Sequence, residues 1–242
     1  MAAKKRFYKS VLLADDGLSI QLDGRNLHSP AGSLLRLPTM ALASAIADEW
    51  RAQDDDIDPA TLPLFSLSVT VVDRVIPQRD AIIAELSAYG GNDLLCYRDD
   101  QDDLANLQQD QWQAWLDDLA ENRGIALQIG SGVMPIFQPD AAKFYPLIAA
   151  YDNWRLGMLH RATSLSGSLV LGLNFLEGTI DDKIMFNLAF LDELWQNEKW
   201  GTDIEAADRH GFLRAELRDV AHFLALLCDT AAARKLAISG DP

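Results

Sequence analysis

The chain has 242 residues, with 36 acidic side chains (Asp and Glu) against 21 basic ones (Lys and Arg), so its formal net charge is -15 at pH 7. A free-standing nucleic-acid-binding protein needs a basic surface that neutralises phosphates, so this charge argues strongly against that class. The same charge disfavours binding to anionic membranes. Hydrophobic residues make up 49% of the chain, which is enough apolar material for a core without disulfide bonds.

The first 38 residues have the pattern of a β region. Residues 18–22 alternate between apolar and polar side chains, which is typical of a half-buried strand. Asp23-Gly24 directly follows and predicts a tight hairpin turn. Residues 7–13 and 34–37 are two further strand candidates. This part of the chain is therefore expected to form a small sheet.

A helix is predicted to follow, with Thr39 as its N-cap. Leu42, Ile46 and Trp50 recur at a spacing of four and predict one buried helix face, with the helix reaching about Gln53. We therefore expect Trp50 to have a structural role. We interpret the acidic run at residues 54–59 as a solvated linker that breaks the helix. A calcium-binding loop is disfavoured, because Pro59 stands where such a loop would still need ligands.

After Pro63 the chain reads as almost wholly helical. Helices are expected over residues 63–77, 81–89, 104–122, 140–161, 164–177, 181–200 and 203–234. Residues 93–97 fit either a short strand or a helical turn, and residues 124–139 fit a connection with a short extended piece. The pattern predicts an α+β fold, with a small N-terminal β-rich domain and one helix over residues 1–62 and a larger C-terminal helical bundle over residues 63–242.

The longest stretch without a charge, residues 162–176, has 15 residues. A bilayer needs about 20, so we interpret this stretch as a buried central helix and expect no contact with a membrane. Cys96 and Cys228 are the two cysteines, too few for a disulfide framework, which favours a reducing, cytosol-like compartment.

Catalytic signatures are missing from the sequence. It contains no phosphate-binding glycine loop, no dinucleotide fingerprint and no nucleophile elbow. The four histidines never stand three or four residues apart, as helical metal ligands would, and each is interpreted as structural or exposed. The acidic clusters are interpreted as hydrated surface. We therefore expect no cofactor, no metal, no catalytic residue and no small-molecule substrate.

One predicted helix, over residues 181–200, carries apolar side chains on two faces. Ile184, Leu188, Leu191 and Trp195 form one stripe, and a second, aromatic stripe consists of Phe186, Phe190, Glu193, Asn197 and Trp200. A carboxylate among aromatic rings loses hydration, so Glu193 is chemically discordant there. It is either a buried residue that pairs with an arginine or caps a helix, or an acidic anchor on an aromatic contact surface.

Several short pieces of the sequence form a distinctive series along the chain. The most extended is Leu191-Asp-Glu-Leu-Trp-Gln196 with Lys199-Trp-Gly201. The shorter pieces before it are Arg6-Phe-Tyr-Lys9, Leu22-Asp-Gly-Arg25, Ser29-Pro30, Leu37-Pro38-Thr39, Glu49-Trp50, Ala52-Gln53, Pro63-Leu64, Asp73, Asp93-Leu-Leu-Cys-Tyr-Arg98 and Gln111-Trp112. In these pieces and their order, from about Arg6 to Leu227, the sequence resembles the assembly chaperone family of the F-type ATP synthase catalytic head.

This resemblance implies a chaperone and not an enzyme. Family members bind the unassembled alpha subunit and hold it until the beta subunit replaces them. The family's important acidic residue falls on Glu193, and its important tryptophan falls on Trp50. Mitochondrial relatives carry a targeting presequence, whereas here the Arg6-Phe-Tyr-Lys9 piece comes almost at once. We therefore expect a bacterial protein of the cytoplasm, with Glu193, Phe186, Phe190, Asn197 and Trp200 at the partner surface.

Two alternatives remain at this level. The first is a hydrolase-type enzyme that uses Glu193 as a general acid, although no partner base, nucleophile or metal site is visible. The second is a structural subunit that stays permanently in a complex.

Overall fold

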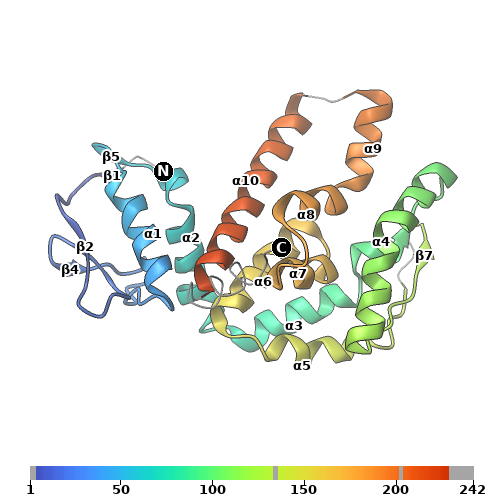
Figure 1. Cartoon of the computed structure of the whole chain (residues 1–242), viewed down its shortest axis with the longest axis horizontal. Coiled ribbons are helices and arrows are strands. Elements are labelled where there is room, and N and C mark those ends of the chain that lie inside the picture. The colour runs from blue at the N-terminus through green and yellow to red at the C-terminus, as the bar shows by residue number, and fades with distance from the viewer. Residues whose placement is uncertain (1–3, 133–135, 202–203, 229–242) are drawn as a thin grey trace, which may run out of the picture. The chain divides into compact units, whose positions relative to one another are not determined.

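The computed structural model describes residues 4–132, 136–201 and 204–228. Within them the chain forms two compact units (Figure 1). The first contains the described residues up to Gln78 and those from His222 on, and the second is Arg79–Ala221. The expected order, a small β region followed by a mostly helical part, is confirmed. The domain boundary after residue 62 stays a prediction, and residues 63–78 group with the N-terminal unit.

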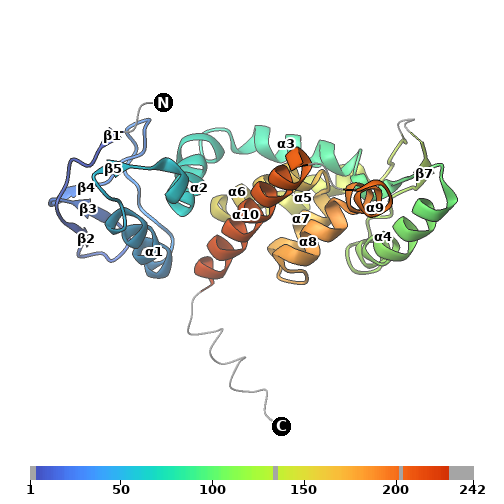
Figure 2. The same cartoon turned by 90° about the horizontal axis from the view of Figure 1, so that it is seen from above.

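Within the described ranges the strands are short and lie in three separate sheets (Figure 2). In the first unit, β2 (Val11–Leu13), β3 (Ile20–Leu22) and β4 (Arg25–Asn26) form an antiparallel sheet, and β1 (Lys4–Lys5) pairs with β5 (Asp56–Ile57). In the second unit, β6 (Tyr97–Arg98) pairs in parallel with β7 (Gly130–Ser131). The acidic run at 54–59 is therefore not a plain linker, because two of its residues pair with β1.

The hairpin predicted at Asp23-Gly24 is confirmed between β3 and β4. Both residues have positive φ angles, 49° and 77°, which a tight hairpin turn of this type requires. The strand predicted at residues 34–37 was wrong: this segment makes only isolated bridges, Ser19 to Arg36 and His28 to Leu34.

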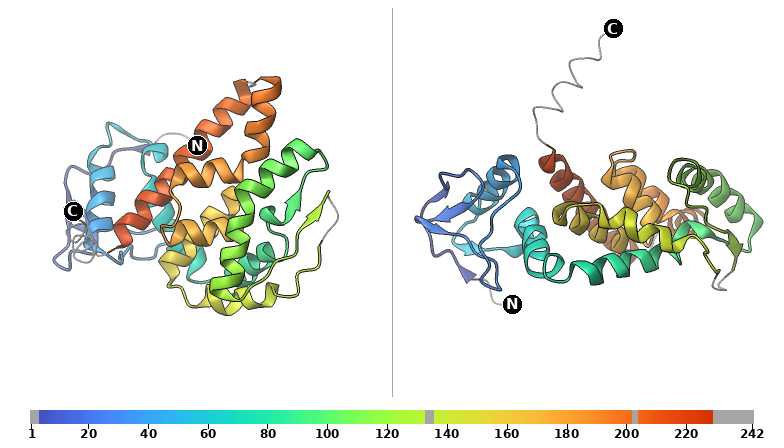
Figure 3. Two further views of the ribbon diagram at one scale, coloured as in Figure 1. Left: turned by 45° about the vertical axis from the view of Figure 1, so that its right-hand side comes forward. Right: turned by 90° about the horizontal axis from the view of Figure 1, so that it is seen from below.

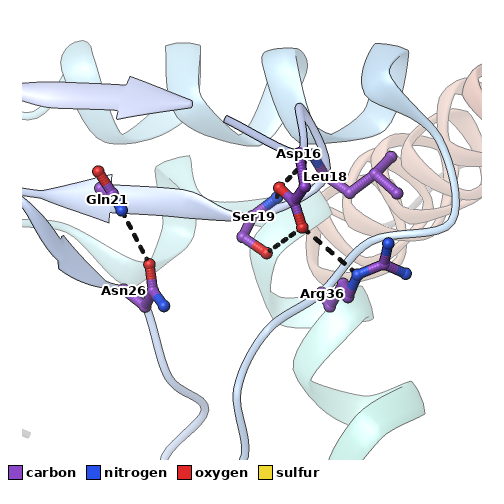
Figure 4. A network of polar contacts seen from close by, with 6 residues as sticks. All are labelled: Asp16, Leu18, Ser19, Gln21, Asn26 and Arg36. Atoms are coloured by element: carbon purple, nitrogen blue, oxygen red, sulfur yellow. Dashed lines mark hydrogen bonds and ion pairs between the residues drawn. The ribbon is translucent and has the colours of Figure 1, made fainter. Parts of the chain in front are cut away.

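A polar network closes the edge of this sheet (Figure 4). The Asp16 carboxylate accepts hydrogen bonds from the backbone N–H groups of Leu18 and Ser19, at 2.9 and 3.0 Å, and pairs with Arg36. The Leu18 N–H is the main cause that holds the pKa of Asp16 below its ordinary value, and burial opposes it. Next to it, the Gln21 amide donates to Asn26 across β3 and β4. The Asp16–Arg36 pair links the turn between β2 and β3 to the segment that leads into the first helix.

Helix α1 (Met40–Arg51) begins where the sequence predicts, with Thr39 Oγ1 accepting from the Leu42 N–H. Trp50 lies in the core of the first unit, 6% exposed, with its ring edge-on to Tyr8 and Phe65 at centroid distances of 5.6 and 5.0 Å. Its neighbour Glu49 accepts hydrogen bonds from the first N–H groups of α2 (Pro63–Thr70). Two consecutive residues thus fix α2 against α1.

The second unit consists mainly of helices, which Figures 1 and 3 show from several sides. They are α3 (Arg79–Gly90), α4 (Asp102–Arg123), α5 (Phe144–Ala149), α6 (Asn153–Ser166), α7 (Leu169–Leu176), α8 (Asp182–Ala189), α9 (Leu191–Trp200) and α10 (Ile204–Leu227). The residues of α10 from His222 on group with the first unit. The part of the last predicted helix from residue 229 on lies outside the described residues.

The uncharged stretch at residues 162–176 is buried, as predicted, but it is not one helix. It comprises the end of α6, a left-handed turn at Gly167 (φ 74°), and α7, whose residues Leu169 to Phe175 are all buried. The Asp93 carboxylate, itself fully buried, accepts from Ser168 Oγ at 2.7 Å and from the Val170 N–H at 3.0 Å. Asp93 therefore caps α7 from inside the core. No helix in the described ranges is long and apolar enough to cross a membrane.

Residues 93–97 combine both structures that the sequence left open, a short 3-10 turn (η3, Leu94–Cys96) followed by β6. The single helix expected over 140–161 was wrong, since α5 and α6 are separated near Asp152.

The single helix expected over 181–200 was also wrong, because α8 and α9 are separated at Phe190, where φ is -112° and ψ is 24°. In a continuous helix the Leu188 carbonyl would accept from the backbone N–H four residues on. Here it accepts from the Trp112 indole N–H at 3.0 Å, and α4 thereby favours the break.

Candidate partner-binding site on α9 and α10

Three of the predicted partner-binding residues lie on one face of α9. Glu193, Asn197 and Trp200 are separated by four and three residues, which places them on the same side of a helix. Trp200 is 68% exposed, and Glu193 and Asn197 are partly exposed. We call these three residues the α9 face. Figures 1 and 3 show α9 and α10 running in opposite directions next to each other.

Two side chains of α10 hold Glu193 in place. Arg209 Nη1 and His210 Nε2 each donate to Glu193 Oε2, at 2.7 Å. The Glu193 side chain is 40% exposed, whereas His210 is only 4% exposed. The sequence alternatives for Glu193 were a buried residue that pairs with an arginine or caps a helix, and an acidic anchor on an aromatic contact surface. The observed residue combines an arginine partner with a carboxylate that solvent still reaches.

The two phenylalanines of the predicted stripe lie beneath this carboxylate. Phe186 and Phe190 are 1% and 7% exposed, and their ring centroids are 4.7 Å apart. Both rings contact the His210 ring, at 5.3 and 5.9 Å, and the Arg209 guanidinium lies over Phe190 at 5.7 Å. They pack behind Glu193 and its two partners and offer almost no surface of their own.

Helix α4 supports the start of α9 from the other side. Gln108 is buried, donates to Asp192 Oδ1 at 2.8 Å and accepts from the Asp99 N–H at 2.7 Å. Burial raises the pKa of Asp192, and the Gln108 hydrogen bond opposes that rise. At the far end, Lys199 pairs with Asp103 and lies 3.9 Å above the Trp195 ring. Both ends of α9 are thus held on α4, which gives the α9 face a defined position.

The sequence-based prediction missed two exposed apolar residues of α10. Ile204 at the start of α10 and Phe212 further along it are 79% and 62% exposed. Phe212 stands in a stretch rich in charged residues, and an aromatic residue in such a stretch was the available signal. The Trp195 and Trp200 rings also meet edge-on at 5.7 Å. Exposed apolar groups are therefore present at both α9 and α10.

The described residues also bear on metal ligation and thiol chemistry. Within the described ranges, no group of three or more His, Cys, Asp or Glu side chains could hold a metal ion. Of the four histidines, His160 and His210 are buried, and His28 and His222 are exposed. Cys96 is buried, which raises the pKa of its thiol to about 12 and makes it a poor nucleophile.

Comparison with known proteins gives a consistent result. Residues 5–120 match the ATP12 chaperone protein family. The crystal structure of Atp12 from Paracoccus denitrificans is 38% identical and covers 93% of this chain and 98% of its own, with a TM-score of 0.86. A mutant of the same P. denitrificans protein has a TM-score of 0.87.

Two further relatives extend the comparison. The Atu1473 protein of Agrobacterium tumefaciens is 34% identical over 93% of this chain and 86% of its own, with a TM-score of 0.84. The mitochondrial protein atp12 of Schizosaccharomyces pombe is 26% identical over 215 residues, or 82% of this chain and 74% of that protein. The chain therefore belongs to the ATP12 chaperone family of non-enzymatic assembly factors, as the resemblance in its sequence predicted.

Proposed function

We propose that this chain is an assembly chaperone of the F-type ATP synthase, that it works in the bacterial cytoplasm, and that it binds the unassembled alpha subunit until the beta subunit replaces it. Membership of the ATP12 chaperone family supports the chaperone part, and the solved relatives come from bacteria. The proposed contact surface is the α9 face.

The observation that carries this proposal is the state of Glu193. An exposed carboxylate is usually mobile, and holding it costs side-chain entropy. Here Arg209 and His210 have already fixed it, through bonds that both end on Oε2. Oε1 has no hydrogen bond among the described residues and can accept one from a partner. A carboxylate fixed before binding loses less entropy when the partner arrives.

The apolar part of the proposed surface comes from Trp200. A subunit that lacks its neighbour exposes apolar surface, which aggregates unless it is covered. Trp200 is large and exposed on the α9 face, and aromatic side chains of this kind dominate many protein interfaces. Phe186 and Phe190 are buried, so we assign them a positioning role beneath Glu193, while Asn197 adds a polar contact on the same face.

Charge reversal at Glu193 tests the proposal. Glu193→Lys should keep the fold, because the exposed pair with Arg209 contributes only about 0–1 kcal/mol to stability, and the buried His210 N–H that loses its acceptor costs about 1–3 kcal/mol. It should abolish the protection of the alpha subunit, because it places a positive charge beside Arg209 and removes the acceptor. Thermal melting of the variant reports the fold, and light scattering of aggregating alpha subunit reports protection.

Glu198→Lys is the matched control. Glu198 lies on the same helix and is exposed, and the charge change is the same, but it is five residues away and points about 140° from Glu193. It should melt and protect like the wild type. A folded Glu193→Lys chain that still suppresses aggregation would show that Glu193 is not the anchor.

A further inference from the structure

A positively charged cavity lies between α8 and α10 in this acidic protein. Its volume is about 500 Å³, and it is lined by Asp182, Lys183 and Asn187 of α8 and by Gly211, Arg214 and Arg218 of α10. Three basic side chains against one acidic give the lining a charge of +2, whereas the whole chain carries -15. The lining of the cavity is therefore positively charged, opposite in sign to the net charge of the chain.

The basic groups of the cavity have no carboxylate partner among the described residues. Among residues 4–132, 136–201 and 204–228, none of Lys183, Arg214 and Arg218 forms an ion pair with a carboxylate. By contrast, Arg209 and Arg161 on neighbouring surfaces pair with Glu193 and Glu216. Unpaired arginines that converge on one hollow are available to an external anion.

The helix geometry keeps this hollow open. Lys183 and Asn187 are four residues apart on α8, and Gly211, Arg214 and Arg218 follow at spacings of three and four on α10, so each set lies on one helix face. A methyl group added at Gly211 would meet no atom within 4 Å. The missing side chain at Gly211 therefore leaves open space in the hollow, and no neighbouring atom requires a glycine there. The Arg214 guanidinium lies 4.0 Å above the Phe186 ring, which limits its freedom.

We infer that this cavity binds a carboxylate-bearing segment of the client protein, as a second anchor beside Glu193. The inference rests on the proposed function. Arginine guanidinium groups match the planar, bidentate geometry of carboxylates, and the Asn187 amide can donate a further hydrogen bond. Asp182 on the lining disfavours a doubly charged phosphate more than a singly charged carboxylate.

The cavity and the α9 face are linked through buried side chains. Arg214 lies over Phe186, Phe186 contacts the His210 ring, and His210 donates to Glu193. An acidic anchor and a basic anchor are thus built on one packed cluster. Two anchors of opposite charge would accept a client in one orientation only, because the reversed orientation places like charges together.

The experiment measures binding of purified, unassembled alpha subunit to full-length variants of this chain. The double variant Lys183→Glu with Arg218→Glu reverses two exposed charges that have no partner among the described residues. Gly211→Leu fills the hollow without changing its charge. The matched control is Lys9→Glu with Arg25→Glu, which makes the same change of net charge on exposed residues of the first unit.

We expect the dissociation constant to rise at least about tenfold for the double variant and for Gly211→Leu, and to stay near the wild-type value for the control pair. The melting temperatures of all variants should stay close to that of the wild type. The binding of the double variant should also depend less on salt.

The outcomes separate this inference from the proposed function. If the wild-type chain does not bind the alpha subunit, both fail. If it binds and Glu193→Lys does not, but the double variant and Gly211→Leu bind like the wild type, only the cavity assignment fails. Titration with inorganic phosphate is the second arm. Phosphate binding that the double variant loses, with client binding unchanged, would make this a phosphate site and overturn the inference.

Discussion

Replacing Trp50 with alanine should destabilise the first unit severely. The indole is 6% exposed, contacts the rings of Tyr8 and Phe65, and lies on a backbone whose carbonyl accepts from the Tyr8 hydroxyl at 2.6 Å. Deleting a buried tryptophan leaves a cavity that the surrounding helices and strands fill only in part. The usual cost is about 3–5 kcal/mol of unfolding free energy, and edge-on aromatic contacts place this residue at the upper end.

Trp50→Phe should cost much less. The indole Nε1 is buried without a hydrogen-bond acceptor among the described residues, and such a group costs about 1–3 kcal/mol. Phenylalanine removes this unpaired donor and keeps most of the ring contacts. The gain offsets much of the lost volume, so we expect a net cost below about 1.5 kcal/mol.

Chemical denaturation followed by circular dichroism measures these differences. Trp200→Ala is the matched control, because Trp200 is 68% exposed and its loss should change stability by no more than about 0.5 kcal/mol. Equal costs for Trp50→Ala and Trp50→Phe would show that the ring contacts kept by phenylalanine do not stabilise the first unit. A Trp50→Ala chain as stable as the wild type would refute the structural role of this residue.

Three further predictions concern stability. Asp93→Asn should lower the free energy of unfolding by about 1–3 kcal/mol, because both carboxylate oxygens accept hydrogen bonds and the amide NH2 group of asparagine would replace one of these acceptors with a second donor. Denaturant titration measures the change, and an unchanged midpoint would contradict the capping role. Gly90→Ala should cost about 1–3 kcal/mol in the same assay, because its methyl group would overlap the fully buried Phe144 ring; a more stable variant would refute this close approach. Asp16 has a pKa below the ordinary 3.8, so its contribution to stability is present above that pH and is lost as the pH falls through the lowered value. Asp16→Asn should therefore be less stable than the wild type at neutral pH, with a difference that shrinks in acid; a difference independent of pH would contradict the assignment.

Local signals in the sequence predicted much of the fold. Asp23-Gly24 and Thr39 each specify a turn or a cap through their own backbone and side-chain chemistry, and both form as expected. The charge-free stretch at 162–176 correctly indicated burial. The error over residues 181–200 arose where a tertiary contact overrides a local pattern. The periodicity over 181–200 continues through Phe190, but the Trp112 indole takes the Leu188 carbonyl and the helix ends there.

The candidate site was likewise only partly predictable, because local patterns indicate helix faces but not tertiary contacts. Glu193, Asn197 and Trp200 share one face of α9 in the structure, as helical spacing predicts. Phe186 and Phe190 belong to the preceding helix and its junction, so a stripe drawn on one continuous helix gave no measure of their burial. The partners of Glu193 lie 16 and 17 residues further along the chain, and no short-range pattern links them to it. Their identification needed the packing of α10 against α9.

The most direct test of the account is capture of the client by this chain in its own cells. Tagged wild-type chain, recovered by affinity from growing cells, should contain free alpha subunit and no assembled ATP synthase, and added beta subunit should displace the alpha subunit from it. Tagged Glu193→Lys should recover none. Recovery of the complete synthase with the wild-type chain would identify a permanent subunit and contradict the chaperone account.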